Sequence, residues 1–271
     1  MSNQKDFKEK NPVNIVELKD IKKTFNKGYV NQVELFNNFN LTIQKGSFTT
    51  VVGSNGSGKT SLLNIICGNI SIDQGYIFLN GEDINHYKEY QRAKKIGRVF
   101  QDPSLGTCPQ LTILENLSLA YNKNKAFSLS PAISKRNIEF FGSQLKLLEM
   151  GLENKMTQKV ATLSGGQRQA LALLISTLTP IDLLILDEHT AALDPKSSET
   201  IMALTDSFIK SKKITTLMVT HNLRYAVDYG DRIIMMHQGD MVVDAKEREK
   251  ENYQIEDLLK IFNSISIECG N

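Results

Sequence analysis

The sequence of 271 residues has few cysteines and little that would mark a secreted or membrane-spanning chain. Its three cysteines, Cys67, Cys108 and Cys269, are far apart and form no CxxC pair, which argues against a zinc knuckle or a disulfide framework. The polar N-terminus lacks the apolar core of a secretory signal. No apolar run reaches the ~20 residues that span a bilayer. We therefore predict a protein of a reducing compartment with no membrane span of its own.

An excess of charge of one sign is also missing. The chain carries 32 basic and 30 acidic residues, a formal net charge of +2. Such a balance creates no strong field toward nucleic acid or anionic lipid, so we predict no nucleic-acid partner. The hydrophobic fraction of 41% is ordinary for a globular protein. The length suits one large domain, or one domain with an insert.

Strand-like and helix-like segments alternate along the chain, which is typical of an α/β fold. Alternating patterns over residues 14–18 and 35–43 predict strands. Residues 183–186 form a continuous apolar run, as in a parallel strand that is buried on both faces. Residues from about 102 to 178 are mostly helical in pattern and interrupt the strands. We therefore predict an α/β core with an inserted helical subdomain at about 102–178.

The remaining predicted elements set the domain boundaries. Residues 1–13 are predicted to be a disordered tail, residues 14–245 the main domain, and residues 246–271 a helical extension. Within the main domain, Asn80-Gly81 predicts a hairpin turn and Gly68 a helix end. The further predicted segments are strands at 47–52, 214–220 and 232–236, helices at 61–67 and 255–262, and a polar connection at 122–134.

A glycine-rich loop follows the strand predicted at 47–52 and precedes an apolar helix. Its residues match G-x-x-x-x-G-K-[ST], the pattern of a loop that cradles phosphates. Backbone N–H groups and the helix N-terminus would bind the phosphates, Lys59 would reach the β- and γ-phosphates, and the Thr60 hydroxyl would ligate Mg²⁺. A loop that merely turns the chain explains the glycines but not Lys59-Thr60 at this spacing. The predicted nucleotide-binding residues are Gly53, Ser54, Asn55, Gly56, Ser57, Gly58, Lys59, Thr60 and Ser61.

Two acids end the apolar run at 183–186. Successive strand residues face opposite sides, so we expect Asp187 and Glu188 to diverge. Asp187 is then suited to the Mg²⁺ shell, and Glu188 to orienting or deprotonating a water that attacks the γ-phosphate. Alone, the run could be a strand that ends in solvent. With the phosphate loop upstream, we predict an ATP-hydrolysing site.

Between these motifs lies Leu163-Ser164-Gly165-Gly166-Gln167, and here the chain resembles the ATP-binding subunits of ABC transporters. The resemblance covers about residues 15–243. It implies a P-loop NTPase core with an N-terminal antiparallel β-subdomain and an inserted α-helical subdomain. It also implies ATP and Mg²⁺ as cofactors, and that Ser164, Gly165, Gly166 and Gln167 bind the γ-phosphate of ATP held by a second copy of the chain.

Other positions are carried over by the same resemblance. Gln101 would contact Mg²⁺ and the attacking water and act as a hinge for the helical insert. Asp194 would cross the dimer interface, and His221 would contact the γ-phosphate. Phe25 would stack on adenine, with Tyr29 as a competitor. His189 departs from the proline that usually follows the catalytic glutamate. The absence of that proline would loosen the backbone, and the histidine would add a titratable group near the site.

The sequences of residues 97–103 and 187–194 resemble those of ATPase subunits of bacterial importers assigned to tryptophan and tyrosine. This implies a peripheral protein on the cytoplasmic face of the cell membrane. Its partners would be integral-membrane permease subunits and, through them, an extracytoplasmic solute-binding protein. Gly106-Thr107-Cys108-Pro109 is expected to be an exposed loop near the coupling surface. The alternatives are an exporter ATPase, a soluble ABC protein that acts on ribosomes or DNA, and a module that binds ATP without hydrolysing it.

Overall fold

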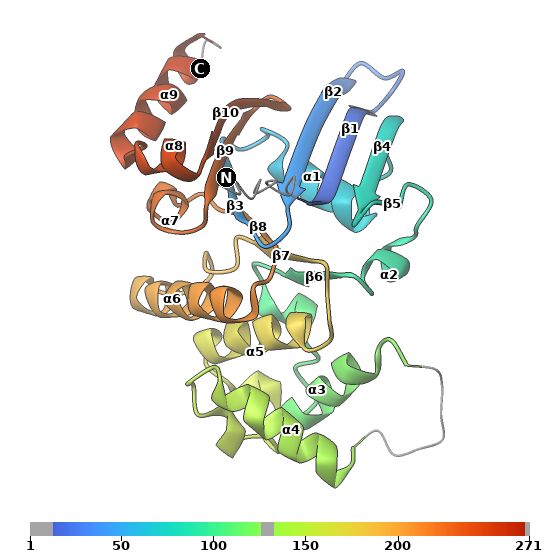
Figure 1. Ribbon diagram of the computed structural model, residues 1–271, viewed down its shortest axis with the longest axis vertical. Helices are drawn as coiled ribbons and strands as arrows, with labels where there is room; N and C mark the ends of the chain where they lie inside the picture. Colours follow the sequence, from blue (N-terminus) through green and yellow to red (C-terminus); the bar gives the residue numbers. More distant parts are fainter. Residues whose placement is uncertain (1–12, 126–132, 269–271) are drawn as a thin grey trace, which may run out of the picture.

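The computed structural model describes residues 13–125 and 133–268, which form two sheets flanked by helices (Figure 1). The first sheet is antiparallel, and its strand order is β2-β1-β4-β5. It comes almost entirely from the N-terminal part of the chain, as predicted. Its strands are β1 (Asn14–Phe25), β2 (Val33–Gln44), β4 (Gln74–Leu79) and β5 (Glu82–Asp83).

The second sheet has the strand order β10-β9-β3-β8-β7-β6. All neighbouring pairs are parallel except β10 with β9. Because the strands are parallel, the loops after β3, β7 and β8 leave the same edge of the sheet, where ligands of such folds bind. The strands are β3 (Phe48–Gly53), β6 (Ile96–Val99), β7 (Leu183–Asp187), β8 (Thr216–Val219), β9 (Arg232–His237) and β10 (Asp240–Lys246).

Helices cover both faces of this second sheet. Figure 1 shows α3 and α4 at one end of the long axis, with α5 and α6 between them and the strands. The helices are α1 (Lys59–Cys67), α2 (Glu89–Arg92), α3 (Ile113–Asn122), α4 (Lys135–Lys146), α5 (Gly165–Thr177), α6 (Pro195–Lys212), α7 (Leu223–Asp228), α8 (Glu247–Glu251) and α9 (Ile255–Glu268). Short 3₁₀ turns occupy Pro103–Gly106, Leu152–Asn154 and Val160–Thr162.

The core lies on both sides of the second sheet, and strand β7 shows why its sequence is uniformly apolar. Leu183 and Ile185 belong to the cluster shared with α1 and the antiparallel sheet. Leu184 and Leu186 belong to the cluster shared with the inserted helices. Both faces of β7 are therefore buried, which confirms the prediction of a parallel strand without polar alternation. The predicted α/β fold with an antiparallel β-subdomain and inserted helices is also confirmed.

Local turn chemistry follows the sequence closely. Asn80 and Gly81 both have positive φ, 52° and 79°, between β4 and β5, as a tight hairpin turn requires. Gly68 ends α1 at φ 86° in the left-handed region. Helix α1 starts at Lys59 rather than at the predicted Ser61, because left-handed Gly58 immediately precedes it.

The predicted tail at 1–13 and connection at 122–134 lie largely outside the described residues. The domain boundaries themselves stay a prediction. Across the described part of the chain, no helix combines the length and the apolar character needed to cross a membrane.

Candidate functional site

The phosphate loop lies at the edge of the parallel sheet, between β3 and α1. Gly56 and Gly58 have φ values of 78° and 105°, which residues with a side chain rarely adopt. A Cβ on Gly58 would lie 3.2 Å from the Phe36 ring, and a Cβ on Gly53 would lie 2.3 Å from the Met236 carbonyl oxygen. The glycines therefore allow a loop that is both left-handed and closely packed.

Lys59 folds back over this loop. Its Nζ donates to the carbonyl oxygens of Gly53 and Ser54, at 2.8 and 2.9 Å, and the residue is only 5% exposed. Burial lowers the pKa of Lys59, and the nearby Glu188 carboxylate partly opposes that shift. The buried Ser57 Oγ has no hydrogen-bond partner. A cation and an unpaired hydroxyl thus line a loop whose shape suits an anion.

A small cavity of about 190 Å³ brings the loop together with two distant residues. Lys59 and Thr60 line it together with Glu188 and His221. These four were predicted as site residues, and they line one cavity although they are far apart in the sequence. The roles assigned to them stay predictions.

Glu188 diverges from Asp187, but for a different reason from the one expected. Strand β7 ends at Asp187, so Glu188 is not an alternating strand residue. Its φ is 48°, and this left-handed turn redirects the side chain. Its Oε1 lies 2.6 Å from His221 Nε2, and the side chains of Glu188 and His221 are 17% and 45% exposed.

Asp187 faces another partner. Its Oδ2 accepts a hydrogen bond from Arg98 Nη2 at 2.7 Å, and Arg98 Nη1 donates to Asn64 Oδ1 at 2.9 Å. Asp187, Arg98 and the exposed Gln101 line a second cavity of about 1000 Å³, next to α1 and α5. Gln101 thus lines the same cavity as Asp187 but is not among the residues that line the smaller cavity. The side-chain oxygen atoms of Asp187, Gln101 and Thr60 are of the kind that Mg²⁺ prefers as ligands.

The Ser164 segment lies apart from the phosphate loop. Ser164 is the exposed N-cap of α5, and its Oγ accepts from Gln167 N at 3.3 Å. Gly166 is buried inside the same helix start. A Cβ on Gly165 would lie 3.0 Å from Leu193, so this helix tip borders the loop before α6. The four residues 164–167 are not among those that line the smaller cavity.

Two other predicted residues lie at element ends. Asp194 is the exposed N-cap of α6, where it accepts from Ser197 N at 3.1 Å, and this hydrogen bond lowers its pKa. Phe25 ends β1 opposite Val33, with Lys23 Nζ 5.3 Å from its ring centre. Tyr29 is 75% exposed. Which of the two aromatic rings meets adenine stays a prediction.

His189 is not the titratable group near the site that the sequence suggested. It is 2% exposed, and its Nε2 lies 3.3 Å from the hydroxyl of Thr205 in α6. Burial lowers the pKa of His189 to about 4, so the imidazole is neutral near pH 7. His189 therefore joins the loop after β7 to α6, and it does not add charge to the site at neutral pH.

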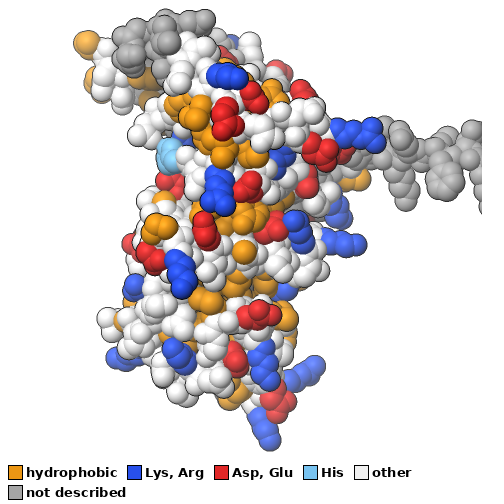
Figure 2. All heavy atoms as spheres, turned by 90° about the vertical axis from the view of Figure 1, so that its left-hand side faces the viewer, with side chains coloured by type: hydrophobic (Ala, Val, Ile, Leu, Met, Phe, Trp, Pro, Cys, Tyr) orange, Lys and Arg blue, Asp and Glu red, His pale blue; other side chains and the backbone are white. Residues whose placement is uncertain are grey.

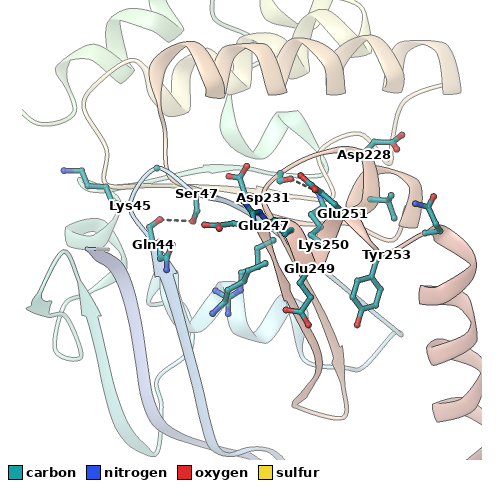
Figure 3. A pocket seen from close by; sticks show the side chains of 17 residues that line it. Gln44, Lys45, Ser47, Asp228, Asp231, Glu247, Glu249, Lys250, Glu251 and Tyr253 are labelled. Carbon is teal, nitrogen blue, oxygen red and sulfur yellow. Dashed lines mark hydrogen bonds between the residues drawn. The ribbon is translucent and has the colours of Figure 1, made fainter. Parts of the chain in front are cut away.

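A further cavity of about 940 Å³ lies at the opposite edge of the second sheet (Figure 3). Ser47 lines one side of it, and Lys250 of α8 lines the other. Lys250 Nζ donates to the carbonyl oxygens of Tyr229 and Gly230, at 2.5 and 2.6 Å. None of the described residues that line this cavity was predicted as a site residue, so it is separate from the phosphate loop.

Surface charge is mixed on the face that carries the C-terminal helices. Figure 2 shows Lys and Arg side chains interspersed with Asp and Glu over that face. This matches the formal net charge of +2, and that face has no extended field of one sign.

Sequence reasoning missed two contacts within the site. It did not pair His221 with Glu188, because the two residues follow different strands. It also passed over Arg98, although a lone basic residue within the short strand Ile96–Val99 was a usable signal. A charge that points into a packed fold needs a partner, and here that partner is Asp187.

Comparison with known sequences identifies the family of the chain. Residues 36–191 match the family described as "ABC transporter". The chain is 46% identical over 250 residues to the tyrosine transport ATP-binding protein of Clostridioides difficile (strain R20291), covering 92% of this chain and 98% of that one. It is 32% identical over 256 residues to ABC transporter ATP-binding protein YxdL of Bacillus subtilis (strain 168), covering 93% and 95%.

Comparison with solved structures gives the same fold. A dimeric ATP-binding cassette in a post-hydrolysis state, bound to ADP and Pi, aligns with a TM-score of 0.72 at 30% identity, covering 86% of this chain and 99% of that one. A nucleotide-free cassette of an ABC transporter aligns with a TM-score of 0.74 at 23% identity, covering 95% and 100%. The second likeness supports the fold alone.

Proposed function

The chain belongs to the ABC transporter family as an ATP-binding, ATP-hydrolysing subunit, and we propose that the transporter it powers imports an amino acid of the aromatic kind. One observation carries the choice of solute: the 46% identity, over nearly the whole of both chains, to a protein named for tyrosine transport. No residue of this chain would touch the solute, so the proposal concerns the transporter that the chain serves.

The geometry supports a role for each group around the smaller cavity. Lys59 exchanges its two carbonyl partners for the β- and γ-phosphate oxygens of ATP. Glu188 takes a proton from a water whose oxygen then bonds to the γ-phosphorus, and the bond from that phosphorus to the bridging oxygen breaks to release ADP. His221, at 2.6 Å from Glu188, holds the carboxylate toward the γ-phosphate.

Mg²⁺ fits the donors available. The Thr60 hydroxyl, the Asp187 carboxylate and the Gln101 amide oxygen are hard oxygen ligands, and Asp187 and Gln101 line the same cavity. These three residues would hold the ion together with the phosphates. When bound, Mg²⁺ neutralises charge that develops on the phosphate oxygens.

A second copy of the chain would complete the site. The exposed Ser164 helix tip carries N–H groups suited to an anion, yet it is separate from the cavity of its own phosphate loop. A head-to-tail dimer would bring the tip of one copy to the phosphates held by the other. The dimeric state of the similar cassette bound to ADP and Pi supports this arrangement.

The membrane partner would dock near the second cavity. The 3₁₀ turn Pro103–Gly106 and the exposed Cys108 follow Gln101 directly, and Leu105 on that turn is 69% exposed. A permease segment packed there would sense movement of Gln101 and of the inserted helices. In this proposal the chain works on the cytoplasmic face of the membrane, and a solute-binding protein acts from the opposite side through the permease.

The test is reconstitution with the permease that co-purifies with the chain. We expect tyrosine or tryptophan, delivered with the cognate solute-binding protein, to stimulate ATP hydrolysis in proteoliposomes. Spermidine and a branched-chain amino acid are the matched controls. Stimulation by a control solute alone would overturn the assignment of solute, and stimulation without a binding protein together with outward movement would favour an exporter.

A further inference from the structure

Arg98 lies beside Asp187, and the hydrolytic scheme above does not use it. The other residues of β6 are Ile96, Gly97 and Val99, so Arg98 is the one charged side chain of that strand. The side chains of Arg98 and Asp187 are only 14% and 16% exposed, and their ion pair measures 2.7 Å. An ion pair with so little contact with water is weakly screened, so its effect on neighbouring ions is large.

The guanidinium of Arg98 contacts residues of three segments, which are α1, the end of β7 and the position directly after β6. It donates to Asn64 Oδ1 of α1 at 2.9 Å, it pairs with Asp187 at the end of β7, and its carbon lies 4.7 Å from the centre of the Phe100 ring. Asn64 lies one turn after Thr60 on α1, so both share a helix face. The Arg98 guanidinium is therefore held among the segments that carry Thr60, Gln101 and Asp187.

The position of Arg98 creates a competition. A carboxylate that binds a guanidinium has already lost much of its pull on another cation, and a divalent ion placed nearby is repelled by the same guanidinium. Asp187 Oδ2 is engaged by Arg98, whereas the ligand role proposed above requires this carboxylate to face Mg²⁺.

We propose that Arg98 is a positioning residue that neutralises Asp187 in the nucleotide-free protein, so that a divalent cation gains this carboxylate only together with nucleotide phosphates. The inference rests on the proposed role of Asp187 as a metal ligand. It predicts that Arg98 reduces the contribution of Mg²⁺ to nucleotide affinity, and leaves affinity without Mg²⁺ nearly unchanged.

The experiment measures ADP binding by calorimetry on the full chain, in EDTA and in excess Mg²⁺. We expect Arg98→Met to leave ADP affinity in EDTA within about twofold of wild type. We expect it to increase the gain in affinity from Mg²⁺ by roughly tenfold, the effect of one lost charged hydrogen bond. Arg98→Lys keeps the charge and should restore a gain close to that of wild type.

Two further variants separate this effect from general electrostatics. Lys95→Met removes one positive charge three residues away, where Lys95 pairs with Glu82, and it should leave the Mg²⁺ gain unchanged. In the Asp187→Asn background, Arg98→Met should have no further effect on that gain, because the two residues act as a unit. If Arg98→Met does not fold, Arg98→Gln carries the same predictions.

The outcomes distinguish this inference from the proposed function. An equal gain from Mg²⁺ in wild type and Arg98→Met, a smaller gain in the variant, or an effect that persists with Asp187→Asn would each overturn the role of Arg98. Absence of any gain in both proteins would contradict the metal site and the role of Arg98 together. A gain that appears only without Arg98 supports the competition directly.

Discussion

At the scale of single residues, Glu188 combines a left-handed backbone with a carboxylate held by His221. The φ of 48° and the 2.6 Å contact aim this carboxylate away from Asp187. The two adjacent acids therefore line different cavities, which suits the proposed division between a metal ligand and a base for water. Such a division is what an ATP-hydrolysing site needs.

Replacing Glu188 by glutamine removes the proposed base while it keeps the shape of the side chain. We expect Glu188→Gln to lower turnover by roughly 10²- to 10⁴-fold and still to form ATP-bound dimers. Phosphate release and size-exclusion chromatography in ATP measure the two properties. Glu199→Gln is the matched control, because Glu199 is an exposed acid near His221 that pairs with Arg224. Normal hydrolysis by Glu188→Gln would remove it from the role of base.

His189 makes the stability of the nucleotide-free protein depend on pH. Its pKa is about 4 in the fold, against 6.5 for an ordinary histidine, so the unfolded chain binds the proton more readily. Stability from this group is complete above pH 6.5 and is lost as the pH falls toward 4. We expect protonation of His189 in the unfolded chain to lower the free energy of unfolding by about 2 kcal/mol between pH 7 and pH 5.

Urea unfolding at the two pH values measures this loss. Other titrating groups contribute to both wild type and His189→Gln, so the difference between their pH dependences isolates the imidazole. We expect the variant to be less sensitive to acid by about 2 kcal/mol. Identical pH dependences would show that His189 is accessible to protons in the folded state.

At the scale of elements, the contact between α5 and β6 depends on one missing side chain. A Cβ on Gly97 would lie 2.5 Å from the Ser176 carbonyl oxygen and 3.0 Å from the Ile181 side chain. Ser176 Oγ also donates to the Arg98 carbonyl oxygen at 2.8 Å. The helix that begins with the Ser164 tip is thus seated directly on the strand that leads to Gln101.

Gly97→Ala should therefore destabilise the protein by about 1–3 kcal/mol, the usual cost of overpacking. Gly142→Ala in α4 is the control, because its Cβ would meet only Met156 at 3.8 Å, and alanine favours a helix. Thermal unfolding measures both. A Gly97→Ala protein as stable as wild type would mean that α5 can move away from β6 without loss.

Sequence patterns predicted those elements whose signals are local. A pattern of a few residues is enough to identify the phosphate loop, the Asn80-Gly81 turn and the buried strand β7. Helix α6 is not among the predicted elements, although Asp194 and Pro195 form a typical helix start, because the family resemblance assigns Asp194 only to the dimer interface. The ion pair of Arg98 with Asp187 and the pair of Glu188 with His221 arise from strand order, and no local pattern encodes strand order.

At the scale of the whole molecule, the separation of Ser164 from its own phosphate loop has a consequence for mixed dimers. We assume that each site combines the Lys59 loop of one copy with the Ser164 tip of the other. If one copy then has a defective loop and the other has a defective tip, both defects fall in the same site. A dimer of Lys59→Ala with Ser164→Arg then has one site with both defects and one site with none.

We expect each variant alone to hydrolyse ATP at a small fraction of the wild-type rate, because a homodimer of Lys59→Ala or of Ser164→Arg has a defect in both of its sites. Mixing the two should restore activity in the mixed dimers, up to about half of the wild-type rate per dimer if the sites work independently. Phosphate release is measured against mixing ratio, with a maximum near equal amounts.

A double variant, Lys59→Ala with Ser164→Arg, mixed with wild type is the matched control, because every mixed dimer then has a defect in both sites. If each copy hydrolysed ATP within its own chain, mixing two inactive variants could restore nothing, whereas the double variant would leave its wild-type partner active.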